Sequence, residues 1–237
     1  MPATVIAEQA GTAPVLTARG LYHIYREGEM RTAALRGADL TLEPGSWTTV
    51  MGPSGSGKST LLHALAGVLE PSAGSVSIDG EDVTRLRPAD RARWRRRRVG
   101  VVLQRDNLHP LLDLAENVAL PLRLDRRDED GIRRRVVELL QLVGLAHRGD
   151  HRVASLSGGE GQRAALAVAI ATRPRVLLAD EPTGELDEVT AGGILDLLDG
   201  LVRDDRLALL TVTHSAQVAE RADRRLTMRD GRVLHER

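Results

Sequence analysis

The chain lacks cysteine and phenylalanine, and it has only two tyrosines and two tryptophans among its 237 residues. Without cysteine it can form no disulfide, no thiolate metal site and no cysteine nucleophile. Aromatic side chains make up 2% of the chain and hydrophobic residues 42%. Aliphatic side chains must therefore fill the core, in a chain whose length suits one large domain or two small ones.

The chain also lacks a charge of one dominant sign. Basic and acidic residues number 33 each, so the formal net charge is zero, which argues against a globally basic nucleic-acid-binding protein. Lys58 is the single lysine, and the other 32 basic residues are arginines. This arginine bias is typical of a GC-rich genome and needs no functional explanation.

Long hydrophobic runs are missing as well. No apolar run approaches the roughly 18 residues that span a bilayer, and residues 61–69 and 164–171 are the best candidates. The N-terminus has no basic region followed by a sustained apolar stretch, so it does not resemble a signal peptide. We expect residues 1–13 to form a flexible tail and the protein to reside in the cytosol.

Short β-rich runs alternate with helical stretches along the chain, which predicts an α/β fold. We expect strands at 15–19, 35–42, 47–51, 75–78, 99–103, 176–179 and 207–213. We expect helices at 59–66 and at 132–143, where apolar residues recur on one helical face. No repeat or Pro-rich linker divides the chain. It is predicted to be a single domain over 14–237, with a core at 14–103 and 161–237 and a helical subdomain at about 104–160.

A glycine-rich turn lies between an expected strand and an expected helix. It fits the phosphate-binding pattern G-x-x-x-x-G-K-[ST] and consists of Gly52, Pro53, Ser54, Gly55, Ser56, Gly57, Lys58 and Ser59, followed by Thr60. Glycines allow successive backbone N–H groups to surround a phosphate, and the helix dipole favours the same anion. Lys58 can reach the β- and γ-phosphates, and Ser59 can ligate magnesium.

Two acids follow a continuous apolar run, 122 residues after Lys58. Asp180 and Glu181 come at the end of an expected buried strand, which places them at the edge where α/β proteins bind ligands. We expect Asp180 to hold magnesium through water and Glu181 to orient or deprotonate an attacking water. The alternative is an acidic start of a loop.

A second helix start carries Ser157, Gly158, Gly159 and Glu160. Ser157 and Glu160 have the spacing of a capping box, so the segment could simply be a well-capped helix. Alternatively, its exposed N–H groups and glycines form a second phosphate site.

Together these residues resemble the ATP-binding-cassette (ABC) ATPases over nearly the whole chain. The segments GPSGSGKS, LSGGE and VLLADEP look like the Walker A loop, the family signature, and Walker B followed by the catalytic glutamate. Four further residues occupy family positions in the expected order: Tyr25 (adenine stacking), Gln104 (Q-loop), Asp187 (D-loop) and His214 (switch histidine). The resemblance implies a P-loop NTPase (RecA-like) core with an antiparallel β subdomain and an inserted α-helical subdomain.

The resemblance also implies a mechanism. The cofactors would be ATP and Mg²⁺, with Ser59, Gln104 and Asp180 serving the metal and Glu181, His214 and Gln104 serving catalysis. Two subunits would dimerise head to tail, so that the Walker A loop of one and the signature of the other enclose each ATP. Hydrolysis would then reopen the dimer, and Gln104 would couple the site to the helical subdomain.

Finer features are similar to the lipoprotein-releasing and macrolide or antimicrobial-peptide exporter ATPases. They are the segments at 21–28 and 116–122 and the sequence ADEPTGELD. This implies an integral-membrane permease partner of the FtsX-like, four-span type, together with a second copy of the chain or a paralogous ATPase subunit. No nucleic-acid partner is expected. The subunit would be soluble when isolated and would sit peripherally on the cytoplasmic face of the membrane, held by the permease.

Two departures leave an alternative function open. Gly161 stands where the family commonly has glutamine, and Glu185 stands where it commonly has asparagine or alanine. The alternative is a low-turnover ATP-dependent regulator, or a mechanotransmission ATPase that moves no solute. A soluble ABC ATPase acting on DNA or ribosomes is disfavoured, because the chain has one cassette and no room for a long coiled coil.

Six arginines fall in the eight residues 91–98. The simplest interpretation is a solvated segment, and the alternatives are contact with anionic lipid headgroups or with nucleic acid. His147 and His151 are four residues apart but flank a glycine, so we expect no metal site there.

Overall fold

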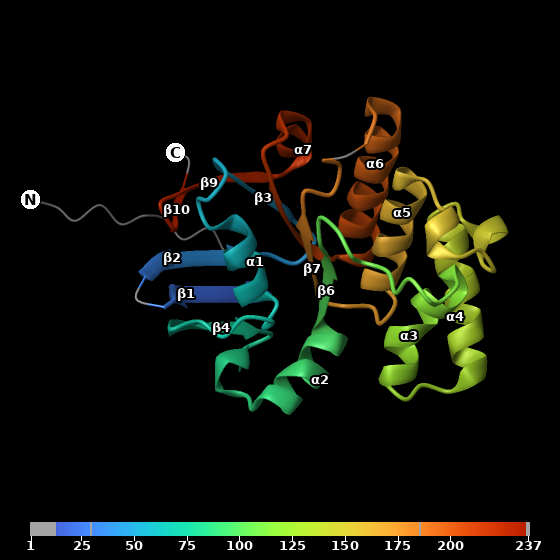
Figure 1. Cartoon of the computed structure of the whole chain (residues 1–237), viewed down its shortest axis with the longest axis horizontal. Helices are drawn as coiled ribbons and strands as arrows, with labels where there is room; N and C mark the ends of the chain where they lie inside the picture. The colour runs from blue at the N-terminus through green and yellow to red at the C-terminus, as the bar shows by residue number, and fades with distance from the viewer. Residues whose placement is uncertain (1–12, 29, 185, 236–237) are drawn as a thin grey trace, which may run out of the picture.

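The computed structural model describes residues 13–28, 30–184 and 186–235. Its central layer is a six-stranded sheet in the order β10-β9-β3-β8-β7-β6 (Figure 1). The strands are β3 (Trp47–Met51), β6 (Val99–Val102), β7 (Val176–Asp180), β8 (Ala208–Thr213), β9 (Arg224–Arg229) and β10 (Arg232–His235). All neighbours pair in parallel except β9 and β10. The carboxyl ends of β3, β7 and β8 therefore meet at one edge.

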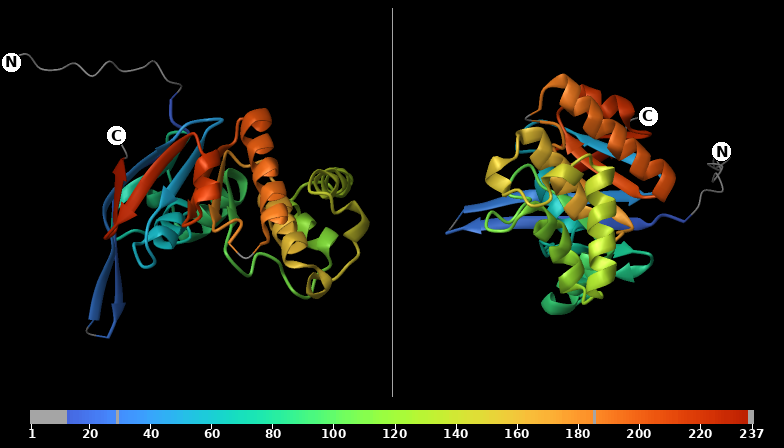
Figure 2. Two further views of the ribbon diagram at one scale, coloured as in Figure 1. Left: turned by 90° about the horizontal axis from the view of Figure 1, so that it is seen from above. Right: turned by 90° about the vertical axis from the view of Figure 1, so that its right-hand side faces the viewer.

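A second sheet is antiparallel and four-stranded, in the order β2-β1-β4-β5. Its strands are β1 (Leu16–Glu27), β2 (Met30–Leu42), β4 (Ala73–Ile78) and β5 (Glu81–Asp82). The hairpin of β1 and β2 extends well beyond the rest of the sheet (Figure 2). The predicted fold class, a P-loop core with an antiparallel β part and helical parts, is confirmed.

Helices cover both faces of the central sheet (Figure 1). They are α1 (Lys58–Leu65), α2 (Pro88–Arg98), α3 (Leu114–Leu124), α4 (Glu129–Leu142), α5 (Gly158–Ala169), α6 (Glu188–Asp205) and α7 (Ala216–Arg221). Single 3₁₀ turns occur at Val83–Arg85, Ala146–Arg148 and Val153–Ser155. In the described part of the chain, no helix is both long enough and apolar enough to cross a membrane.

The hydrophobic core consists of two clusters, one on each face of the central sheet, and alternate residues of the buried strands belong to different clusters. In β7, Val176 and Leu178 pack with α1, α2 and the antiparallel sheet, whereas Leu177 and Ala179 pack with α3 to α7. Continuous apolar runs are typical of strands buried on both faces, and every residue of β7 and β8 is buried. The buried side chains of α3 and α4 belong to the same cluster as those of α5 and α6. The helical segment thus shares its core with the central sheet.

The arginine-rich segment forms α2, and it is more buried than a solvated segment would be. Trp94 is buried, and Arg91 is 9% exposed and pairs with Glu70 at 2.8 Å. Desolvation lowers the pKa of Arg95, whose guanidinium donates to the carbonyl of Gly67. The expectation of a solvated segment thus agrees with Arg93 and Arg97, whose side chains are mostly exposed, but not with Arg91 and Trp94, which are buried against the protein.

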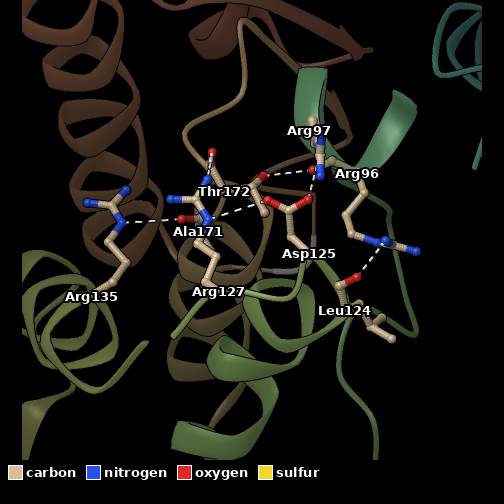
Figure 3. Close-up of polar contacts among 8 residues, drawn as sticks. All are labelled: Arg96, Arg97, Leu124, Asp125, Arg127, Arg135, Ala171 and Thr172. Carbon is tan, nitrogen blue, oxygen red and sulfur yellow. Dashed lines mark hydrogen bonds and ion pairs between the residues drawn. The ribbon is translucent and has the colours of Figure 1, made fainter. Parts of the chain in front are cut away.

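Two of these arginines reach the end of α3. Asp125, whose side chain is 9% exposed, accepts Arg97 at 2.5 Å and Arg127 at 3.4 Å (Figure 3). The neighbouring Arg96 donates to the carbonyl of Leu124 at 2.8 Å, and its own carbonyl accepts the hydroxyl of Thr172 at 2.8 Å. The run therefore joins α2 to the carboxyl ends of α3 and α5, where cations also complement the helix dipoles.

Candidate active site

The glycine-rich loop follows β3 and leads into α1 as predicted. Gly55 and Gly57 adopt φ values of 78° and 104°, which favour glycine. The ammonium of Lys58 folds back over the loop and donates to the carbonyls of Gly52 and Pro53 at 2.8 and 2.9 Å. The backbone of the loop thus surrounds the Lys58 ammonium. A phosphate bound in the loop would lie beside this positive charge.

One polar atom in this loop lacks a partner. Ser56 is only 5% exposed, and its side-chain oxygen is buried without a hydrogen-bond partner among the described residues. Its backbone is held by Pro53 and Gly231. A buried hydroxyl without a partner is costly. Phosphate oxygens are the acceptors that would satisfy it, so the loop fits a nucleotide.

Asp180 ends β7 at the same edge as the loop. The residue is 8% exposed, and desolvation raises the pKa of its carboxyl, while a hydrogen bond from Ser59 and the charge of Lys58 lower it. The charge of the adjacent Glu181 raises it further. A desolvated carboxylate beside a serine hydroxyl is a suitable oxygen donor set for Mg²⁺. No group of three or more His, Cys, Asp or Glu side chains that could hold a metal was found in the described ranges, so phosphate or water oxygens would complete the coordination.

Glu181 lies against the carboxyl end of β8. Its Oε2 accepts the hydroxyl of Thr213 at 2.7 Å, and its Oε1 accepts the backbone N–H of His214 at 3.1 Å. The His214 ring nitrogen Nδ1 lies 2.7 Å from the same Oε1. Glu181 has a φ of 46°, and its N–H donates to the carbonyl of Val212. Left-handed backbone at a non-glycine residue is strained and is found disproportionately at functional sites.

The two residues expected to act in hydrolysis, Glu181 and His214, are therefore in direct contact. An ionised carboxylate only accepts hydrogen bonds, so Nδ1 must carry the proton in this arrangement. The His214 side chain is 76% exposed whereas that of Glu181 is 12% exposed. The histidine can thus reach a ligand in front of the sheet while the glutamate stays anchored.

Tyr25 lies on β1 beside the start of α1. Its hydroxyl is 3.4 Å from the hydroxyl of Thr60, and its ring packs edge-on against His23 at a centroid distance of 4.6 Å. The residue is 43% exposed. An aromatic face is therefore available next to the phosphate loop, as adenine stacking would require.

The second helix start is a capping box, as its spacing predicts. The side chains of Ser157 and Glu160 each accept the other's backbone N–H, at 3.3 and 2.9 Å, and Arg148 pairs with Glu160 at 3.0 Å. These hydrogen bonds, led by those of Ser157, lower the pKa of Glu160. The structure therefore contains the predicted capping box. A capped helix start does not conflict with phosphate binding at the same residues.

Gly159 and Asp187 line the same hollow, where α5 approaches α6. Asp187 caps α6 by accepting the N–H groups of Val189 and Thr190, and it also accepts the Thr190 hydroxyl at 2.6 Å. The Thr190 hydrogen bonds lower the pKa of Asp187. A Cβ on Gly159 would clash with the Thr190 methyl group, so close helix packing requires glycine here.

Gln104 lines a cavity of about 390 Å³ together with Glu181, Gly158 and Gly161. A second hollow of about 560 Å³ holds the remaining signature residues and Asp187. Within the described ranges, neither hollow is lined by residues 52–60. Glu185 lies outside the described residues.

Sequence reasoning missed two polar residues that support this site. The Thr213 hydroxyl donates to Glu181. The Thr190 hydroxyl donates to Asp187, the cap of α6, and the Thr190 methyl group packs against Gly159. The signal for Thr213 is a hydroxyl at the carboxyl end of a mostly apolar strand, which also contains Thr211.

Comparison with known proteins agrees with this geometry. The ABC transporter family model matches residues 35–184. The lipoprotein-releasing system ATP-binding proteins LolD of Bordetella pertussis and Bordetella parapertussis are each 43% identical over 228 residues, which covers 96% of this chain and 99% of theirs.

Solved structures show the same fold. The dimeric post-hydrolysis structure of the ATP-binding cassette MJ0796 with ADP and Pi has a TM-score of 0.87 at 36% identity, covering 94% of this chain and 97% of that one. The structure of cbiO1 from Clostridium perfringens, part of the ABC transporter complex cbiONQ, has a TM-score of 0.81 at 29% identity, covering 93% and 87%. This chain belongs to the ABC transporter family, as one of its ATP-hydrolysing, ATP-binding subunits.

Proposed function

We propose that this ABC ATPase drives a permease of the lipoprotein-releasing or peptide-exporting type, of the FtsX-like, four-span kind. The similarity to LolD over nearly the whole of both chains supports this subfamily. The subunit would act peripherally at the cytoplasmic face of the membrane, through that permease. The observation that carries the catalytic part is the meeting of Lys58, Asp180 and Glu181 at one edge of the central sheet.

Each residue has a defined task in this proposal. Lys58 and the loop amides bind the phosphates, and Tyr25 stacks on the base. Glu181 orients the attacking water and takes its proton, and His214 contacts the γ-phosphate. This is phosphoryl transfer to water, in which positioning and charge provide most of the catalysis.

Ser59 and Asp180 would hold Mg²⁺, and the family resemblance adds Gln104 as a further oxygen donor. When bound, the ion would neutralise negative charge on the phosphate oxygens. The raised pKa of Asp180 supports this assignment, because a desolvated carboxylate gains most from a cation. The Ser59 hydroxyl lies close enough to Asp180 to lower the pKa of that carboxyl, against the larger effect of desolvation.

We further propose that two subunits enclose ATP head to tail. The hollow that Ser157, Gly158 and Gly159 line contains no residue of the phosphate loop, so a nucleotide on that loop would meet these residues only in a second subunit. The MJ0796 cassette, similar over nearly the whole chain, is described as dimeric in its ADP- and Pi-bound structure. The permease partner would then respond to dimer closure through the helical segment next to Gln104.

The test is Glu181→Gln in the full chain. Hydrolysis should fall about 10²- to 10⁴-fold because the water loses its base. At saturating Mg-ATP, light scattering should show a stable dimer that is absent without nucleotide. Glu220→Gln, an exposed acid on α7, is the matched control and should behave like the wild type. Wild-type hydrolysis by Glu181→Gln would overturn the catalytic assignment, and a monomer in Mg-ATP would overturn the dimer.

A further inference from the structure

The hydroxyl of Thr213 is fixed between two groups. It accepts the backbone N–H of Ser215 at 3.0 Å and lies 2.7 Å from Oε2 of Glu181. Thr213 is the last residue of β8 and is fully buried. Because the N–H of Ser215 occupies an acceptor position and the carboxylate can only accept, the hydroxyl proton must point at Glu181.

The two oxygens of Glu181 are not equivalent. Oε1 accepts both the N–H and the ring nitrogen of His214, which together fill its two acceptor positions. Oε2 accepts the hydroxyl of Thr213, which leaves one acceptor position on that oxygen. Oε2 is therefore the oxygen that can still accept a hydrogen bond from water.

We propose that Thr213 is a positioning residue for hydrolysis, which sets the direction in which Oε2 of Glu181 receives the attacking water. This rests on the proposed role of Glu181 as the base. Both chain segments are held independently of the side chains: Glu181 N–H donates to Val212, and β8 is paired with β3 and β7 on either side. The hydroxyl thus acts from a rigid strand, as a precise site requires.

The same strand supplies a matched control. Thr211 is also fully buried, two residues earlier in β8, and its hydroxyl contacts the indole N–H of Trp47 and the hydroxyl of Thr49. Replacing Thr211 or Thr213 by valine removes a buried hydroxyl of the same size from the same strand. Only Thr213→Val removes a donor to Glu181.

The experiment is single-turnover hydrolysis of labelled Mg-ATP with the full chain in excess, for Thr213→Val, Thr213→Ser and Thr211→Val. Misplacing a reacting group slightly can cost about 10²-fold, so Thr213→Val should lower the rate about 10- to 100-fold. Affinity for ATP, measured by fluorescence of a labelled analogue, should change less than about 3-fold, because binding does not use this contact. Thr213→Ser should restore the rate, and Thr211→Val should keep it even though it lowers the melting temperature.

A cycle with Glu181→Gln separates this inference from the proposal beneath it. If Thr213 acts through Glu181, Thr213→Val should add no further loss in the Glu181→Gln background. If Glu181→Gln lowers the rate but Thr213→Val does not, or if the two losses multiply, Thr213 has no positioning role. If Glu181→Gln itself has no effect, the proposed base is wrong and this inference falls with it.

Discussion

Gly159 offers a sharp test of the packing around the signature segment. A methyl group at position 159 would clash with Cγ2 of Thr190. The threonine cannot rotate freely, because its hydroxyl donates to the cap residue Asp187 at 2.6 Å. Gly159→Ala must therefore either push α5 away from α6 or break a contact at the start of α6.

The magnitude follows from comparison with Gly161 on the same helix, where a Cβ would meet nothing within 4 Å. Gly161→Ala should stabilise the fold by up to about 1 kcal/mol through helix propensity. Gly159→Ala gains the same stabilisation from helix propensity but loses about 1–3 kcal/mol of stability from overpacking. The two variants should thus differ by about 2 kcal/mol, or about 6 °C in melting temperature for a domain of this size.

The assay is thermal unfolding without nucleotide, so that ligand binding does not contribute. Thr190→Ser removes the obstructing methyl group and keeps the hydroxyl for Asp187. In the double variant it should restore most of what Gly159→Ala loses. Equal melting of Gly159→Ala and Gly161→Ala, or purely additive effects of Gly159→Ala and Thr190→Ser, would refute the steric argument. If it holds, lost ATPase activity in Gly159→Ala cannot be assigned to phosphate contact alone.

Three further outcomes are expected. Lys58→Arg keeps the charge, but a planar guanidinium fits poorly between two loop carbonyls, so steady-state ATPase activity should fall at least about 10-fold. Asp180→Asn removes a desolvated charge, so the nucleotide-free protein should melt at or above the wild-type temperature while Mg-dependent hydrolysis is lost. Asp125→Asn weakens the ion pair with Arg97, and calorimetry should show a loss of about 1–2 kcal/mol, most of it absent when Arg97→Gln is already present.

The central strands were predictable because burial on both faces leaves a plain pattern. The expected strand at 47–51 has the observed bounds, and those at 176–179 and 207–213 are each within one residue. The helix expected at 132–143 is seen as Glu129–Leu142, because its apolar spacing marks one buried face. The phosphate loop and the capping box were equally readable, since both are local patterns of residue type.

Elements without such a pattern were missed. The β1–β2 hairpin extends beyond the expected strands, and there it carries the exposed side chains of Tyr22, Ile24 and Met30. Its strands have register shifts, so no regular alternation of apolar and polar residues marks this part. The helix α2 has an arginine-rich sequence whose burial depends on acceptors such as Asp125, far along the chain. No sequence pattern shows such partners, because they are set by the tertiary packing. The contact of Thr213 with Glu181 was hidden for the same reason.

The adjacent acids Asp180 and Glu181 show how the fold assigns different chemistry to two similar side chains. Asp180 ends a regular strand and faces Ser59 at the start of α1. Glu181 turns into the left-handed region, which costs a non-glycine residue about 1–3 kcal/mol, and this turn brings its carboxylate to Thr213 and His214 at the end of β8. One carboxylate is thereby kept beside the phosphate loop, where a cation would offset its desolvation. The other is held by three donors, which leave one acceptor position on Oε2. The left-handed backbone at Glu181 thus places two adjacent carboxylates in different surroundings, as the proposed division between binding a cation and activating water requires.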